Sequence, residues 1–394
     1  MALIGLVAGR TPGSAFELAK VLSFSIIPVF IIGPIAGVYV DRWDKRTTLF
    51  LCDFIRGLLI LTIPLLFITR DSMWPIYGIV FLSFCLTRFY VPAKMAIVPD
   101  IVKGTHLLSA NSLLTLTGMI AFVLGCACGG FIVEKWGAAG GFLCDAVTFF
   151  SSSLLIMLMS REGKLNVNPK TILNVSREMM GDIRKSVLLE IKDGFSYLVN
   201  HHDIRFIINM LFTLFSAAGA IYVVVIVFVQ EAFGSVTLDL AILAVILGAG
   251  LFAGSVVYGR FGGKIPKLKT IFFSLILGGG MLVLFAGLVQ NHPTLLLAGV
   301  LAFILGVVTG PIFIASNTII HQVSDENMRG KVFSSLEVVI HFAFMLAMLV
   351  SSFLAEHIER YWILIGVGII FAIVGLVGLL TYKKNIHLSE SLVG

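Results

Sequence analysis

Ionisable side chains stand inside several long apolar stretches of this 394-residue sequence. They are Asp53, Arg56, Arg88, Asp145, Glu337 and His341. Carboxylates and imidazoles exchange protons, and guanidinium groups pair with carboxylates. Placing such a group in hydrocarbon costs about 2.5–3.5 kcal/mol even on the mildest insertion scale, so each one needs a partner or a role. The sequence therefore predicts proton coupling or buried charge pairing at these positions.

Two of these groups are close enough in sequence to pair. Asp53 and Arg56 lie three residues apart, on one face of a helix. The pair either supports the basic segment before it or moves during function. Arg88 falls about one turn from the end of its apolar stretch. Its guanidinium either reaches the membrane surface or takes part in proton coupling.

The remaining groups have two interpretations each. Asp145 has no basic residue near it in sequence, and its carboxyl either carries protons or caps neighbouring backbone. Glu337 and His341 lie four residues apart, on one helix face. They form either a carboxyl–imidazole proton relay or an interfacial glutamate beside a packed histidine.

The composition explains why these charges are exceptional. Hydrophobic residues make up 58% of the chain and charged residues 13%, with a mean hydropathy of +1.02. A typical soluble domain has about 25% charged residues. This composition is a poor fit to a soluble enzyme, a disulfide scaffold, a disordered chain or a nucleic-acid-binding domain. The five cysteines lie in apolar runs without metal-ligand spacing, so no metal site is expected.

Long apolar runs divide the chain, and each approaches or exceeds the ~18 residues of a transmembrane helix. Backbone groups in lipid must be satisfied within their own segment, so each run is predicted to be a helix. The expected spans are about 19–40, 47–69, 73–93, 107–133, 138–160, 204–230, 238–259, 268–290, 293–318, 331–355 and 360–382. The apolar segment 1–8 is too short to cross ~30 Å of hydrocarbon. We expect an all-α polytopic membrane protein with about eleven full spans.

A polar segment at 161–203 is the longest connection. Apolar residues follow helical spacing from Ile183 to Leu198, which predicts an amphipathic helix on the inner membrane surface or a solvated linker helix. The segment separates an N-terminal bundle at 1–160 from a six-helix C-terminal bundle at 204–382, with a tail at 383–394.

The basic residues predict the orientation. Most Lys and Arg residues fall in loops on one side of the membrane when the spans alternate. The exceptions in loops on the opposite side are Arg10, Lys20, Arg70, Lys135 and Arg360. Because basic loops stay in the cytoplasm, the 41–46 loop and the C-terminus are predicted to be cytoplasmic, in the plasma or inner cell membrane.

The two halves resemble each other. Gly33-Pro-Ile-Ala-Gly37 ends a span before a basic loop, and Gly250-Leu-Phe-Ala-Gly254 does the same in the second half. Pro92 and Pro311 occupy similar places farther on. Halves related by an axis along the membrane normal are a known transporter architecture.

The first of these repeats belongs to the most specific pattern in the chain. It reads Gly33-Pro-Ile-Ala-Gly37-Val-Tyr-Val-Asp41-Arg42-Trp43-Asp44-Lys45-Arg46. Its glycines allow two helices to approach closely. The segment resembles the loop between the second and third helices of the major facilitator superfamily. The resemblance implies a two-bundle fold, with the first of about twelve helices truncated here. It also implies a gating role for Gly33, Gly37, Asp41, Arg42, Lys45 and Arg46.

A second motif concerns the direction of transport. Gly125, Cys126, Gly129 and Gly130 resemble the Gly-Pro-x-x-Gly-Gly motif of exporters in this superfamily, with Cys126 where proline is expected. The missing proline puts the helix kink of that motif in doubt. The alternative is a plain packing face of small residues.

Further segments resemble the macrolide, enterobactin (siderophore) and multidrug exporters. They are Asp53-Phe-Ile-Arg56, Phe142-Leu-Cys-Asp145-Ala-Val-Thr148-Phe and Arg329-Gly-Lys331-Val-Phe-Ser334. Arg329 and Lys331 are expected to be the second half's counterpart of the basic gate. The superfamily's fourth-helix arginine, which Arg88 matches, is linked to proton transfer.

These observations predict a proton-coupled exporter of drug-like or siderophore-like amphiphiles that works by alternating access. The alternatives are an uptake symporter of the same fold and a transport-impaired truncated form. No G-x-x-x-x-G-K-[ST] segment supports an ATP-driven pump, and no H-E-x-x-H or G-x-S-x-G segment supports an enzyme. The expected partners are the lipid bilayer, a small amphiphilic substrate and protons, without nucleic acid or cofactor. The resemblance implies a monomer.

Overall fold

The structure is a computed structural model that describes residues 1–33, 36, 40, 43–69, 72–102, 106–159, 202–262, 265–323 and 329–384. The linker helix expected within 161–203 falls almost entirely outside these residues, as do Gly37, Asp41 and Arg42. The backbone of Arg329 and Lys331 is described, but their side chains are not. Within the described residues the regular structure is helical, without a strand.

The described part of the N-terminal half contains five helices. They are α1 (Ala2–Arg10), α2 (Ala15–Ile31), α4 (Lys45–Thr69), α5 (Trp74–Ile101) and α6 (Leu107–Leu158). The helix α6 changes direction at Gly137, whose φ of 70° and ψ of 177° are not helical. It therefore holds two helical segments, which correspond to the predicted spans 107–133 and 138–160.

Six helices are described in the C-terminal half. They are α9 (His202–Phe233), α10 (Leu238–Phe261), α11 (Lys267–Asn291), α12 (Leu295–Val323), α13 (Arg329–Leu354) and α14 (Arg360–Lys384). These ranges follow the sequence-based spans to within a few residues.

The helices have the length and composition of membrane spans. Nine segments of the described chain are long and apolar enough to cross a bilayer. One of them, Leu116–Leu158, has 43 residues and includes the bend at Gly137, so it consists of two helical segments. The nine residues of α1 rise only about 14 Å, against about 30 Å of hydrocarbon. The helical membrane fold expected from the sequence is confirmed.

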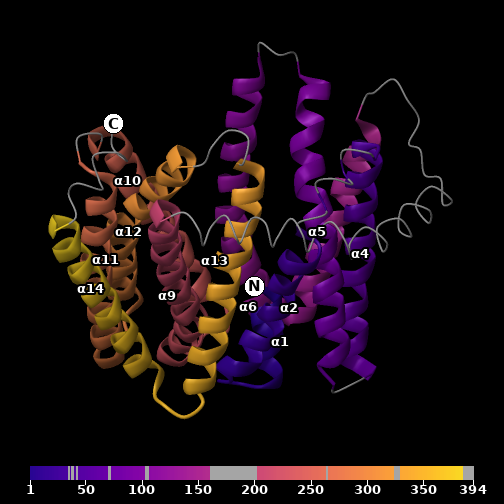
Figure 1. The fold of residues 1–394 in the computed structure, drawn as a ribbon. Coiled ribbons are helices and arrows are strands. Elements are labelled where there is room, and N and C mark those ends of the chain that lie inside the picture. The colour runs from indigo at the N-terminus through magenta and orange to yellow at the C-terminus, as the bar shows by residue number, and fades with distance from the viewer. Residues whose placement is uncertain are drawn as a thin grey trace.

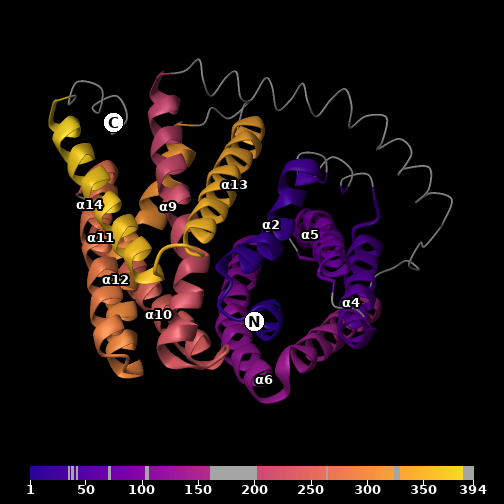
Figure 2. The same ribbon diagram turned by 90° about the horizontal axis from the view of Figure 1, so that it is seen from below.

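The two halves stand side by side as two groups of helices (Figures 1 and 2). Within the N-terminal half, α4 packs on α5 and α6, α2 on α5, and α1 on α6. Within the C-terminal half, α10 packs on α12, α11 on α14, and α9 on α13. The main contacts between the halves join α6 to α10 and α2 to α13.

The helix ends form two opposite faces of the molecule (Figure 1). The Gly13 face carries the short connections at 11–14, 234–237 and 355–359 and lies at the bottom of Figure 1, where the α13–α14 loop turns. The Arg46 face is opposite and carries the first residues of α4, α6 and α11.

Glycines hold α10 and α12 together at backbone contact. Gly254 of α10 lies against the carbonyl of Val307, and Gly250 lies against that of Phe303. In return, Gly310 of α12 lies against the carbonyl of Leu251. Lipid-embedded helices gain no hydrophobic driving force from packing, so close backbone approach is a main source of their association. The Gly250–Gly254 repeat therefore positions α10 within its half.

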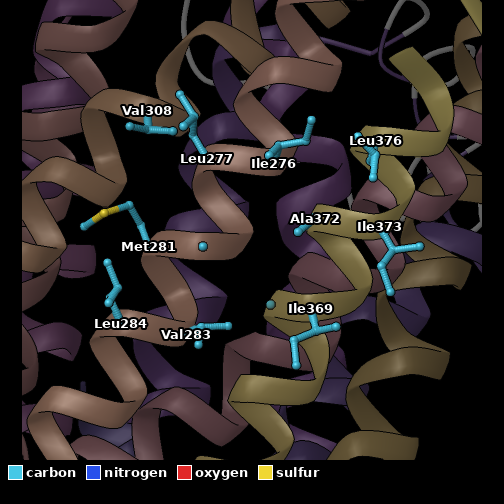
Figure 3. A pocket seen from close by; sticks show the side chains of 12 residues that line it. Ile276, Leu277, Met281, Val283, Leu284, Val308, Ile369, Ala372, Ile373 and Leu376 are labelled. Atoms are coloured by element: carbon cyan, nitrogen blue, oxygen red, sulfur yellow. The ribbon is translucent and has the colours of Figure 1, made fainter. Parts of the chain in front are cut away.

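An apolar groove of about 700 Å³ lies between α11 and α14 (Figure 3). Leu277 and Leu284 line it from α11, and Ile369 and Ile373 line it from α14. These side chains belong to the middle of two membrane spans, and the lining contains no titratable group. The groove therefore faces hydrocarbon and lies apart from the ionisable residues.

We expect Gly254→Ala to lower the free energy of unfolding by about 2 kcal/mol, because the added methyl group overlaps the Val307 carbonyl. Gly248→Ala is the matched control, since a methyl group at Gly248 on the same helix meets nothing within 4 Å. Thermal unfolding of the detergent-purified proteins measures the difference. Equal stability of the two variants would contradict the glycine contact.

Candidate functional site

A buried charge pair lies in the N-terminal half. Arg56 Nη1 donates to Asp53 Oδ1 at 3.2 Å, as their spacing predicted. The second carboxylate oxygen of Asp53 accepts a hydrogen bond from Ser152 Oγ of α6 at 2.6 Å. Asp53 is 2% exposed and Arg56 is 6% exposed. The pair therefore joins α4 to the second segment of α6.

Aromatic rings complete the surroundings of Arg56. Its guanidinium lies 4.7 Å from the ring centre of Tyr90 in α5 and 5.3 Å from that of Phe149 in α6. These contacts compensate part of the charge burial through cation–π attraction. Within the described part of the chain, Nε and Nη2 of Arg56 have no hydrogen-bond partner. The cluster links three helices of one half, and this arrangement favours the supporting role over the moving one.

The basic end of the gating motif is tied to the Arg46 face of the same half. Lys45 Nζ lies 3.0 Å from Asp100 Oδ2 near the end of α5. Arg46 donates to the carbonyls of Ile156 at 3.1 Å and Met157 at 2.5 Å, at the end of α6. A cation at a helix C-terminus is stabilised by the free carbonyls there. These residues fix the ends of three helices relative to one another.

The glycine part of the motif has fewer contacts among the described residues than its basic end. Gly33 is described, and a methyl group there would meet only Val29 Cγ1, at 4.0 Å, within that limit. The close helix approach expected at Gly33 is therefore not formed by the described residues.

An ion pair crosses between the halves. Arg88 Nη1 of α5 lies 3.2 Å from Glu337 Oε1 of α13. Arg88 lies near the middle of α5, and Glu337 lies about two turns inside α13. The Glu337 side chain is 48% exposed, so the protein itself covers only about half of it. Sequence reasoning selected both residues but did not pair them, because they lie 249 positions apart.

His341 contacts the backbone of Glu337 and not its carboxylate. Its Nδ1 lies 2.8 Å from the backbone carbonyl of Glu337, while the Glu337 carboxylate contacts Arg88. The two side chains share a helix face, but the carboxyl–imidazole pair is not formed among the described residues. Arg88 takes the place that the sequence interpretation gave to His341.

Asp145 is exposed in the second segment of α6. Among the described residues its carboxylate has no hydrogen-bond or ion-pair partner, although the charges of the Met1 amino group and of Arg56 act on it electrostatically. The hydrogen bond at this position comes from Thr148 Oγ1 to the Asp145 carbonyl at 2.7 Å. Capping of neighbouring backbone by the carboxylate is thus not observed in this part of the chain.

The exporter-type motif contributes one residue to the contact between the halves. Thr237 Oγ1, at the start of α10, donates to the Gly130 carbonyl at 2.9 Å. A methyl group at Gly130 would lie 3.0 Å from the Thr237 carbonyl and would overlap Ala241. Nothing lies within 4 Å of a methyl group at Gly125, and one at Gly129 would contact only Met1, at 3.4 Å. Gly137 is the residue of α6 with non-helical dihedral angles, so the helix is not broken at Cys126.

Several charged residues of the Gly13 face were not singled out from the sequence. Arg360 donates from Nη2 to the Gly13 carbonyl at 2.7 Å and pairs through Nη1 with Glu231 at 3.1 Å. Glu134 and Glu356 also reach the opposite half. Their only signal in the sequence is a position at a span end, which charged residues occupy for solubility as well.

A metal site is not formed by the described residues, where no three His, Cys, Asp or Glu side chains gather. The described charged groups that are candidates for a functional role are the Asp53–Arg56 cluster, the Arg88–Glu337 pair between halves, and the exposed carboxylate of Asp145.

Comparison with known families gives one match across the chain. The family model described as Major Facilitator Superfamily matches residues 2–286 and 206–392. The matched ranges overlap and together include both halves.

Curated relatives are similar at low identity. The uncharacterized MFS-type transporter YfiS of Bacillus subtilis is 22% identical over 399 residues, covering 97% of this chain and 88% of that protein. Macrolide efflux protein A of Streptococcus pyogenes is 23% identical, covering 95% and 89%. Multidrug resistance protein MdtG of Klebsiella pneumoniae is 25% identical, covering 83% and 74%.

Solved structures share the fold. The nucleoside transporter NupG superposes with a TM-score of 0.66 at 13% identity, covering 97% of this chain and 96% of that chain. A bacterial homologue of the human drug peptide transporters PepT1 and PepT2 gives a TM-score of 0.68 at 13% identity, covering 98% and 94%.

We expect Asp53→Asn to lower the free energy of unfolding by about 3 kcal/mol, because it leaves the buried Arg56 charge without its counterion. The double variant Asp53→Asn with Arg56→Met removes both charges and is expected to recover most of that loss. Chemical unfolding of the purified proteins measures both. A single variant as stable as the unaltered chain would show that the pair is not needed for folding.

Proposed function

The chain belongs to the Major Facilitator Superfamily, and we propose that it exports drug-like or siderophore-like amphiphilic molecules in exchange for protons. The cycle is alternating access, in which one half rocks against the other around a site near the bilayer midplane. Its energy comes from the proton gradient. The protein is a transporter and not an enzyme, and the proposal concerns its direction, cargo and coupling ion.

The Arg88–Glu337 pair is the observation that carries the proposal. Its partners belong to different halves, so their separation changes when the halves rock. Protonation of Glu337 removes the attraction, and a ligand or proton that favours one arrangement shifts the population toward it. A carboxylate that is both accessible and paired across the halves can link proton binding to the conformational change.

The direction of transport is proposed from the relatives and the motif. Macrolide efflux protein A and multidrug resistance protein MdtG are named for export. Gly130, from the exporter-type motif, lies at the contact between the halves. An uptake symporter of the same fold is the second candidate, since the solved structures at 13% identity constrain only the fold.

The topology is proposed from the basic residues. The Arg46 face carries Lys45, Arg46 and the residues leading to α11, so it is assigned to the cytoplasm together with the C-terminus. The Gly13 face is then external. The protein is proposed to work as a monomer in the plasma or inner membrane.

We expect cells that produce this chain to expel a fluorescent amphiphilic dye, and a protonophore to abolish that efflux. A form extended by upstream in-frame codons is tested beside it, because α1 has only nine residues. Efflux from the extended form alone would assign impaired transport to the shorter chain. Dye accumulation driven by the proton gradient would show that the chain is an uptake transporter and not an exporter. Correct membrane insertion of both forms is the control.

Glu337→Gln is expected to reduce protonophore-sensitive efflux at least about tenfold, because the residue no longer exchanges a proton or pairs with Arg88. Glu337→Arg alone places two like charges together and is expected to be inactive. Adding Arg88→Glu to it restores an opposite-charge pair and part of the activity. Glu359→Gln in the exposed α13–α14 loop is the control. Full activity of Glu337→Gln would remove this pair from the coupling mechanism.

A further inference from the structure

Two exposed carboxylates on the Gly13 face reach from one half to the other. Glu356 lies just beyond the end of α13, and its Oε1 accepts two hydrogen bonds from the start of α2. Ser14 Oγ donates at 2.9 Å and the backbone N–H of Phe16 at 3.1 Å. Ser14 is also the N-cap of α2, since its hydroxyl accepts from the Glu17 backbone N–H.

Glu134 makes the same type of contact in the opposite direction. It lies near the end of the first segment of α6, and its Oε2 accepts from the start of α10. The backbone N–H of Thr237 donates at 2.9 Å and that of Leu238 at 3.3 Å. Thr237 is the N-cap of α10 and is 0% exposed.

The two contacts occupy equivalent positions when the N-terminal half is compared with the C-terminal half. Glu134 lies near the end of the first segment of α6, and Glu356 lies just beyond the end of α13. In each half this is the second-to-last helical segment, and the last segment begins three or four residues later. Each one accepts from the first N–H groups of the helix that begins at 15 or 238 in the other half. Each half therefore supplies one carboxylate and one helix N-terminus to the contact.

The physical effect of such a contact is well defined. The first N–H groups of a helix have no partner within the helix. A carboxylate satisfies them and is attracted by the positive end of the helix dipole. When the halves separate at this face, both helices lose these acceptors. When a carboxylate is protonated, the charge–dipole attraction disappears while the fold of each half is unchanged.

From this reciprocal geometry, we propose that Glu134 and Glu356 form a proton-released latch that holds the halves together at the Gly13 face. Protonation of both carboxylates frees the face to open. Both residues are exposed, so protons reach them from the compartment that this face contacts. The proposal rests on the proposed function only for the assignment of that compartment to the outside of the cell.

Other contacts also lie at the Gly13 face, beside those of Glu134 and Glu356. Phe16 and Phe353 pack edge to face with ring centres 5.7 Å apart. Arg360 contacts the Gly13 carbonyl and Glu231. Charged or titratable side chains on the surrounding elements are Arg10, Glu17, Lys20, Tyr77, Lys135, Glu231, Asp239, His357, Glu359 and Arg360. Because several of these also titrate, the test compares variants at each pH.

Ala241→Cys provides a reporter thiol for opening. Ala241 is 0% exposed and lies where α10 meets Gly130 of the other half. The purified variant in lipid nanodiscs is treated with a polar maleimide, and labelling is followed by mass spectrometry at each cysteine. Natural Cys52, 4% exposed within the N-terminal half, reports unfolding in the same sample.

In this background, Glu134→Gln and Glu356→Gln are each expected to raise the labelling rate of the reporter about threefold, and together about tenfold. Glu359→Gln, in the same loop as Glu356, is the matched control and is expected to leave the rate unchanged. Lowering the pH from about 7.5 to about 4.5 is expected to raise labelling in the parent but not in the double variant, because the two glutamine side chains have no carboxylate to protonate.

An unchanged labelling rate in the double variant would overturn the latch. A pH response that persists in the double variant would overturn its release by these two protons. Labelling of Cys52 that rises together with the reporter would assign the effect to unfolding and also contradict the proposal. The measurement needs neither a substrate nor a gradient, so failure of the export proposal leaves this result intact.

Discussion

The absence of water inside a bilayer is the constraint on which the structure depends. Every backbone N–H and C=O group in that region needs a partner within its own helix, so the described spans are helical. The same environment removes the hydrophobic drive for helix association. Backbone contact at Gly250 and Gly254 and polar contacts such as Ser152–Asp53 therefore hold helices of the two halves in place, each within its own half.

Most of the fold could be predicted from the sequence because each span is a local property. The length of an apolar run determines a crossing, and the Asp53–Arg56 pair follows from helical spacing alone. The Arg88–Glu337 contact could not be predicted in this way, because it depends on how the two halves sit against each other. The Glu337–His341 spacing predicted a shared helix face, but of the two interpretations it left open, the carboxyl–imidazole pair is not formed among the described residues, where the carboxylate contacts Arg88 of another helix.

The charged groups divide into two sets with different roles. Lys45, Arg46, Asp53 and Arg56 contact residues of their own half, where they hold the ends and middles of α4, α5 and α6 in place. Arg88, Glu337 and the residues of the Gly13 face contact the other half. A half that is fixed internally and held to its neighbour by a few polar contacts can move as a rigid unit.

The location of Glu134 and Glu356 at a water-exposed face has a consequence for speed. A hydrogen bond broken in hydrocarbon leaves its donor bare, at the full desolvation penalty, whereas one broken at the surface is replaced at once by solvent. The N–H groups of Phe16, Thr237 and Leu238 can therefore exchange a carboxylate for water molecules. Because water replaces the broken hydrogen bonds, the kinetic barrier to separation of the two halves stays low. Separation at this face is then compatible with the microsecond-to-millisecond motions of domains.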